Sequence, residues 1–170
     1  MKEVQVMALL CITMIAVLCD LRSGRIPNAL IVTGLLCGFA YQILANGPAG
    51  FLLFLGGSGL PVLLFSILFY FRMIGAGDIK LLCVPGAFLG PQHGLTCLIF
   101  AVLSGGLISL FLMIHHGNIY VRLQYFAEYV SSYSRDKIWR PYLDGIEESA
   151  KFCFSVPVLL GVLCDIGGII

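Results

Sequence analysis

Charged residues are scarce in this chain, and their scarcity indicates its class. Only 11% of the 170 residues are charged, 59% are hydrophobic and the mean hydropathy is +1.00, whereas soluble domains carry about 25% charged residues. The net charge of +1 gives no indication of a nucleic-acid partner. The composition argues against a soluble fold and predicts an all-α polytopic membrane protein, organised as a single transmembrane domain over residues 1–170.

Paired cysteines of the kind that bind zinc or exchange disulfides are also missing. The seven cysteines lie mostly inside apolar runs and no C-x-x-C pair occurs, so we expect buried, inert thiols. His115 and His116 are adjacent, but no third or fourth ligand stands at a suitable spacing for a metal ion. We therefore expect neither a metal nor a cofactor.

Six apolar runs predict six membrane-spanning helices. They cover residues 4–19, 29–45, 51–71, 79–89, 95–114 and 152–170. The first run resembles a signal peptide but has no small-x-small cleavage site, so we expect a retained helix. The fourth would be only about 17 Å long as a helix, which is too short for a bilayer core of about 30 Å. Either this helix begins before Asp78, or the preceding junction lies recessed below the membrane surface.

Glycine and proline predict where these helices pack and where they end. Gly34-x-x-x-Gly38 in the second run favours close approach of a neighbouring helix. In the third run, Gly56-Gly57-Ser58-Gly59 and Pro61 are compatible with close packing or with a kink. Uncharged turns are expected at residues 46–48 and 90–94.

The basic residues predict how the helices are oriented. With six spans, one face of the membrane receives all of them except Lys2, namely Arg22, Arg25, Arg72, Lys80, Arg122, Arg135, Lys137, Arg140 and Lys151. The positive-inside rule makes this face cytoplasmic and places both termini outside. Between the fifth and sixth spans, residues 115–151 form the one long polar stretch, in which apolar and aromatic residues at helical spacing predict an amphipathic segment at the membrane interface.

Two carboxylates stand beside these apolar runs, where a charge is costly to place. Asp20 follows the first run, Asp78 precedes the fourth, and the predicted topology places both on the cytoplasmic face. Two carboxyl groups within reach of one water share a proton. The ionised group can then take a proton from the water while the protonated group donates to a substrate carbonyl. This pattern predicts peptide hydrolysis without a metal or a covalent intermediate.

Simpler interpretations exist for each residue taken alone. Asp20 alone is typical of a solvated helix end, and Asp78 alone is typical of a helix N-terminus that benefits from the helix dipole. Arg22 and Lys80 are candidates for tuning the pair, although binding to lipid phosphates explains both equally simply. Asp165 stands alone in the last run, and we assign it no role.

The sequence around both acids resembles known proteases. Gly75-Ala76-Gly77-Asp78, followed by Ile79-Lys80, is similar to the G-x-G-D motif of intramembrane aspartyl proteases. The stretch from Asp20 to Asn28, reading DLRSGRIPN, resembles the first-aspartate motif of the type IV prepilin peptidase family. The resemblance covers roughly residues 4–110. It implies that Asp20 and Asp78 are the catalytic pair.

The same resemblance implies further roles and partners. Gly75 and Gly77 would shape the loop before Asp78, while Ile26, Pro27 and Asn28 would begin the second span, with Asn28 as its N-cap. The family removes the short basic leader of prepilins and pilin-like proteins at the cytoplasmic face of the cell membrane, so the expected partners are such precursors and membrane lipids, in a prokaryotic cell. The chain resembles the short, peptidase-only branch, and no methyltransferase activity is expected.

Competing functions remain at this point. A small transporter would carry ionisable residues near mid-membrane, whereas these spans have almost none there, and a non-catalytic subunit of a pilus or secretion assembly needs no carboxylate pair. Within the protease class, an archaeal-type flagellin precursor is an alternative substrate. The sequence leaves open the particular pilin, the cleavage-site preference, the depth of the pair in the membrane and the oligomeric state.

Overall fold

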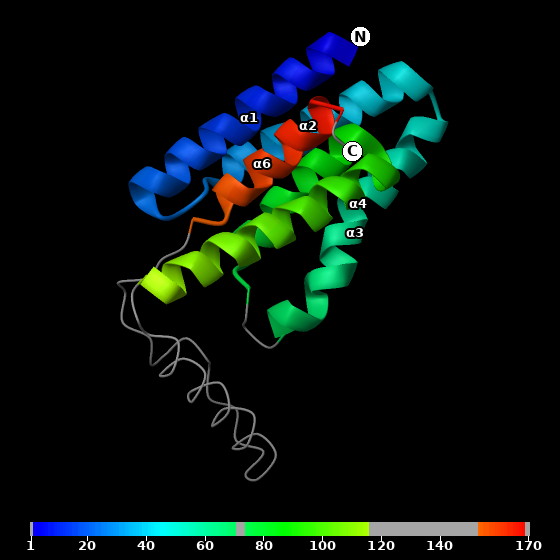
Figure 1. The fold of residues 1–170 in the computed structure, drawn as a ribbon. Coiled ribbons are helices and arrows are strands. Elements are labelled where there is room, and N and C mark those ends of the chain that lie inside the picture. The colour runs from blue at the N-terminus through cyan, green and yellow to red at the C-terminus, as the bar shows by residue number, and fades with distance from the viewer. Residues whose placement is uncertain (1, 71–73, 116–152, 169–170) are drawn as a thin grey trace.

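The computed structural model describes residues 2–70, 74–115 and 153–168. Within these ranges there are five α-helices and no strand: α1 (Lys2–Ser23), α2 (Asn28–Asn46), α3 (Ala49–Tyr70), α4 (Ala76–His115) and α6 (Ser155–Ile166), arranged as in Figure 1. Helices α1 to α4 are long and apolar enough to cross a membrane, whereas α6 has 12 residues. The predicted all-helical membrane class is therefore confirmed.

The fourth and fifth predicted spans share the label α4, but Gly90 divides it into two helices, residues 76–89 and 91–115, that lie side by side, since a Cβ on Gly94 would lie 2.8 Å from Gly86 Cα. Six membrane-crossing spans are not confirmed, because only four elements of the described chain are long and apolar enough to cross a membrane. The turn predicted at residues 90–94 is reduced to a single non-helical residue, Gly90, with φ 78° and ψ −176°. Glycine tolerates this positive φ, and Pro91 has no N–H to continue the helical ladder, so the first helix of α4 ends here and the chain turns back along it. Because α4 begins at Ala76, the helix starts before Asp78, as in the first of the two alternatives for the short fourth span.

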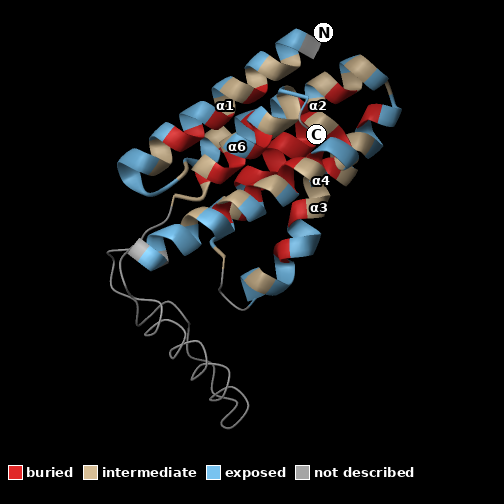
Figure 2. Cartoon of the chain, viewed as in Figure 1, coloured by how far each residue is buried: buried red, intermediate tan, exposed pale blue. Residues whose placement is uncertain are grey.

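The first half of α4 is the core of the bundle. Every residue from 81 to 88 is buried, and α4 packs against α1, α2, α3 and α6. Figure 2 shows the buried residues concentrated along this helix. A helix that is apolar on all sides needs an apolar environment, supplied by lipid or by other helices, and here the other helices supply it.

Glycines allow the close helix contacts that their spacing predicts. A Cβ on Gly38 of α2 would lie 2.9 Å from the Cβ of Ala87, and a Cβ on Gly34 would lie 2.9 Å from Val84 Cγ1. A Cβ on Gly57 of α3 would overlap the carbonyl of Gly86 at 2.0 Å. Of the two alternatives for the glycine-rich part of α3, close packing is confirmed at Gly57, and α3 continues as a helix through Pro61.

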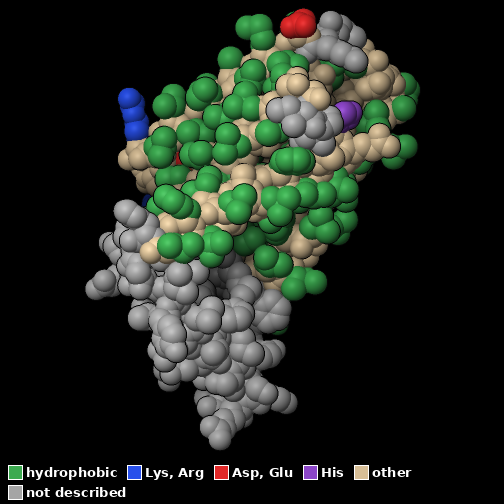
Figure 3. Space-filling view, viewed as in Figure 1, with side chains coloured by type: hydrophobic (Ala, Val, Ile, Leu, Met, Phe, Trp, Pro, Cys, Tyr) green, Lys and Arg blue, Asp and Glu red, His purple; other side chains and the backbone are tan. Residues whose placement is uncertain are grey.

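The outer surface is what a bilayer would contact. Large hydrophobic side chains are exposed on every helix, for example Leu44, Leu63 and Leu107, and Figure 3 shows them covering the face between the charged ends. The N-terminus of α1 and the C-terminus of α6 lie at the same end of the bundle (Figure 1). Which side of the membrane that end faces stays a prediction, and the predicted interfacial segment lies outside the described residues from position 116 onward.

Candidate functional site

Asp20 lies in the last turn of α1. The helix ends at Ser23 and the N–H of Gly24, at φ 60°, donates to the Asp20 carbonyl at 2.8 Å. This left-handed residue closes the helix in the manner of a glycine C-cap. The Asp20 side chain is half-buried, so it has access to solvent without projecting freely into it.

Asp78 lies in the first turn of α4, three residues after Gly75. Its carboxylate accepts a hydrogen bond from the Gly75 N–H, and its own N–H donates to the Gly75 carbonyl at 3.2 Å. A side-chain acid that reaches back to the first free N–H of a helix is half of a capping box. A Cβ on Gly75 would lie 3.1 Å from Asp78 Oδ2, so glycine leaves room for the carboxylate to fold back. Gly77 lies within this first helical turn, with open space around it, and not in a loop.

The tertiary structure brings the two acids into electrostatic contact. The charge of Asp20 acts on Asp78, although the two residues end one helix and begin another. Cys153, just before α6, lies close enough to both acids to be affected by their charges. Burial raises the pKa of its thiol, and the carboxylates of Asp20 and Asp78 raise this pKa further. The three segments that carry these residues therefore meet at one end of the bundle, which we call the carboxylate end.

Ser155, the first residue of α6, completes this end and was missed by the sequence analysis. Its Oγ donates to Asp20 Oδ2 at 2.6 Å, and the residue is 1% exposed. No local signal marks this serine, because it is separated from Asp20 by 135 residues and only the packing of α6 places it.

The residues predicted to begin the second span lie beside the start of α4, at the carboxylate end. Ile26 is half-buried and packs against the hydrophobic core. Pro27, and not Asn28, occupies the N-cap position of α2, so the predicted N-cap is one residue too late. Proline offers no side-chain acceptor, and Asn28 is instead the first helical residue. Its Oδ1 accepts a hydrogen bond from Lys80 Nζ at 3.2 Å.

Neither candidate for tuning the pair forms an ion pair with it. Lys80 is exposed and its ammonium is bound to Asn28, and Arg22 is exposed in the last turn of α1. Among the described residues, the one ion pair joins His93 and Asp165 at 2.9 Å. No cation of the described chain therefore neutralises either acid.

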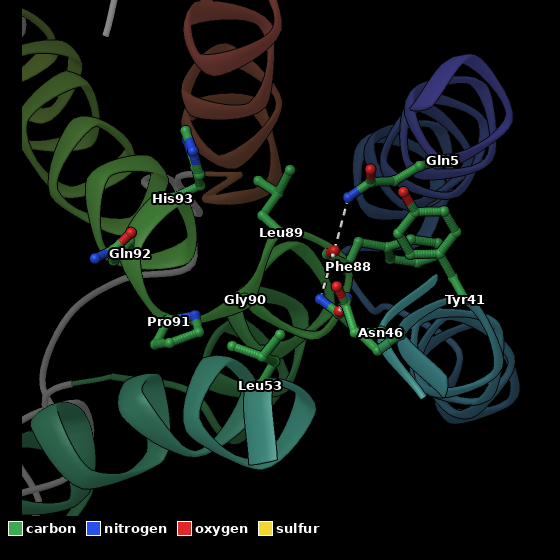
Figure 4. A pocket seen from close by; sticks show the side chains of 11 residues that line it. Gln5, Tyr41, Asn46, Leu53, Phe88, Leu89, Gly90, Pro91, Gln92 and His93 are labelled. Atoms are coloured by element: carbon green, nitrogen blue, oxygen red, sulfur yellow. Dashed lines mark hydrogen bonds between the residues drawn. The ribbon is translucent and has the colours of Figure 1, made fainter. Parts of the chain in front are cut away.

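The opposite end of the bundle carries neutral amides. Gln5 Nε2 and Gln42 Nε2 donate to the carbonyl of Phe88 at 2.7 and 2.9 Å, and Asn46 Nδ2 donates to Gln42 Oε1 at 2.7 Å. Figure 4 shows this amide end, where the hydrogen bonds from Gln5 and Gln42 converge on the carbonyl of Phe88, two residues before Gly90. The bend at Gly90 takes that carbonyl out of the helical ladder, and two amides replace its lost partner. A cavity of about 400 Å³ opens beside them.

Sequence comparison identifies the family to which the chain belongs. A family model described as the type IV leader peptidase family matches residues 7–110, which is more than half of the chain and includes both Asp20 and Asp78. Comparison with curated proteins and with solved structures returned no match.

Proposed function

Because the chain belongs to the type IV leader peptidase family, we propose that it is a membrane-embedded aspartic endopeptidase that removes the short basic leader of prepilins or pilin-like precursors at the cytoplasmic membrane face. Asp20 and Asp78 are the proposed catalytic pair. The observation that carries this function is the convergence of two half-buried carboxylates whose charges interact, at an end of the bundle where neither is neutralised by a cation of the described chain.

The proposed reaction uses one water between the two acids. Two carboxylates whose charges interact do not both ionise cheaply, so in the proposed mechanism the pair holds one proton. The ionised carboxylate takes a proton from the water as its oxygen attacks the scissile carbonyl carbon, and the protonated carboxyl donates its proton to the carbonyl oxygen. The tetrahedral intermediate then collapses, the C–N bond breaks, and the leaving amine takes a proton from the pair.

The surroundings of the pair suit a peptide substrate. Gly75, Ala76 and Gly77 are exposed, and a Cβ on Gly77 would meet nothing within 4 Å. Backbone without side chains leaves room for another chain to approach closely. The exposed apolar side chains of the helices beside the pair would contact the hydrophobic segment that follows the leader in such a precursor.

Leader cleavage in membranes tests this function. The protein is co-expressed with prepilin-like precursors and the loss of the leader is followed by mass. We expect Asp20→Asn and Asp78→Asn each to slow cleavage by at least about 100-fold while remaining inserted, because each removes one half of the proton transfer. Glu3→Gln is the matched control, since it removes an exposed carboxylate from the other end of α1, and we expect it to cleave at the wild-type rate.

Two outcomes would contradict the proposal. Cleavage that persists in either aspartate variant would rule out the two-carboxylate mechanism. A wild-type protein that is inserted but cleaves none of the precursors would favour a non-catalytic subunit of a pilus or secretion assembly, and the next measurement would then be the isolation of a stable complex.

A further inference from the structure

The hydrogen bond between Ser155 and Asp20 joins the last helix to the candidate active site. Ser155 Oγ lies 2.6 Å from Asp20 Oδ2, and Ser155 is 1% exposed. A hydroxyl group has a single hydrogen to donate. It is donated to Oδ2 and fills one acceptor position of that oxygen, whereas Oδ1 accepts no side-chain hydrogen bond within the described chain.

The position of Ser155 is set by the packing of α6 against the rest of the bundle. Helix α6 rests on α4 and contributes the fully buried residues Val158 and Val162 to the core. Its first turn sits over Gly105 of α4, where an added Cβ would lie 3.2 Å from the Phe154 ring and 3.3 Å from Pro157 Cγ. The packing of α6 therefore fixes the serine hydroxyl, and this hydroxyl orients the side chain of Asp20.

We propose that Ser155 is a positioning residue for Asp20, which holds the plane of the carboxylate so that Oδ1 is directed toward the attacking water. This role rests on the proposed peptidase function. Removing the hydroxyl leaves the carboxylate present but free to rotate, and misplacing a reacting group by about 1 Å can cost about 100-fold in rate. We expect the effect on the chemical step and not on substrate binding, because Ser155 is 1% exposed.

Ser155→Ala and Ser104→Ala form a matched pair for the test. Ser104 is a half-buried helix serine whose Oγ lies 2.7 Å from Phe100 O and 3.2 Å from Ala101 O, so its one hydrogen is donated within α4 and to no carboxylate. We expect Ser155→Ala to lower kcat about 10- to 100-fold with KM changed less than threefold. Ser104→Ala should keep the wild-type kcat, and Ser155→Thr, which retains the hydroxyl, should recover kcat to within about fivefold of wild type.

Glycines 105 and 106 of α4 provide a second test that leaves the serine intact. Alanine at Gly105 presses on Phe154 and Pro157 and shifts the first turn of α6, whereas a Cβ on Gly106 meets nothing within 4 Å. We expect Gly105→Ala to lower kcat several-fold and Gly106→Ala to leave it unchanged. Ser155→Ala with kcat within twofold of wild type would overturn the proposal.

A measurement without turnover separates this inference from the peptidase function. The side-chain carboxyl ¹³C resonance of Asp20, assigned by its loss in Asp20→Asn, should shift in Ser155→Ala and stay in place in Ser104→Ala. An unchanged resonance in Ser155→Ala would overturn the positioning role, whatever the activity. If the resonance shifts but the wild type cleaves no precursor, the proposed function has failed and the catalytic use of Ser155 fails with it.

Discussion

The two ends of this bundle use polar side chains in opposite ways. At the amide end, Gln5 and Gln42 bind a carbonyl that the bend at Gly90 has removed from the helical ladder, so their hydrogen bonds repair a defect of the backbone. At the carboxylate end, Asp20 and Asp78 interact through their charges and stay half-buried. Mutual repulsion of two acids does not stabilise a fold.

This difference separates structural from functional polar groups within one membrane protein. Gln5 and Asp20 belong to the same helix, 15 positions or about 22 Å apart along its axis. A polar group that completes a broken backbone ladder is explained by folding, whereas an acid placed against another acid requires a function. Variants at the amide end should thus reduce stability but not cleavage, and variants at the carboxylate end should reduce cleavage but not stability.

The largest expected effect on stability is at Gly57, beneath the amide end. A Cβ there would lie 2.0 Å from the Gly86 carbonyl oxygen, and neither backbone can yield without separating α3 from α4. We expect Gly57→Ala to lower the free energy of unfolding by about 3 kcal/mol or more, measured by thermal unfolding in detergent. Gly59→Ala, where the Cβ meets nothing within 4 Å, should unfold like wild type, and equal stability of the two variants would contradict this contact.

A smaller loss of stability is expected at Gln42. Gln42→Leu removes one of the two donors to the Phe88 carbonyl and the acceptor of Asn46. We expect a loss of about 1–2 kcal/mol in the free energy of unfolding with leader cleavage at the wild-type rate. Gln92→Leu is the control, since Gln92 is exposed beside the same cavity. Loss of cleavage at wild-type stability would show that the amide end takes part in the chemistry.

The thiol of Cys153 offers a chemical probe of the carboxylate end. Burial, Asp20 and Asp78, in that order, raise its pKa, so the reactive thiolate is less abundant at pH 8 than for an ordinary cysteine. Removing a nearby negative charge lowers this pKa and raises the thiolate fraction. In a variant whose sole cysteine is Cys153, we expect Asp20→Asn to speed alkylation about 2- to 5-fold, and Asp78→Asn somewhat less.

The control for this probe is a carboxylate at the other end of α6. Asp165→Asn should leave the alkylation rate of Cys153 unchanged, because Asp165 is paired with His93 and does not contribute to the pKa of Cys153. Equal rates in all variants would mean that the two acids do not converge on Cys153.

The smallest effect is expected at Lys80. Its ammonium binds Asn28, and both side chains are exposed, where a single hydrogen bond contributes little. We expect Lys80→Met and Asn28→Ala to change the cleavage rate by less than about threefold. A large loss in Lys80→Met alone would indicate that the lysine charge acts on the acid pair, and a large loss in both would indicate that their hydrogen bond positions α4.

Much of the site could be predicted from residues that are neighbours in the sequence. Gly75 to Asp78 is a helix start whose acid reaches back to the first free N–H, and Asp20 to Gly24 is a helix end, both of which follow from local backbone chemistry. The bend at Gly90 was less accessible, because a glycine and a proline can end a helix or merely bend it. Here they end one helix and begin another beside it, since a Cβ on Gly94 would lie 2.8 Å from Gly86 Cα.

The sequence by itself determined the membrane class, the helix ends that carry Asp20 and Asp78, and the glycines at which helices approach one another. These features depend on composition and on backbone geometry within a few residues. Only the tertiary structure decided that Ser155 binds Asp20 and that Gln5 and Gln42 share the Phe88 carbonyl. Such contacts join residues 46 to 135 positions apart, and they arise only when the burial of α4 brings the other helices around it.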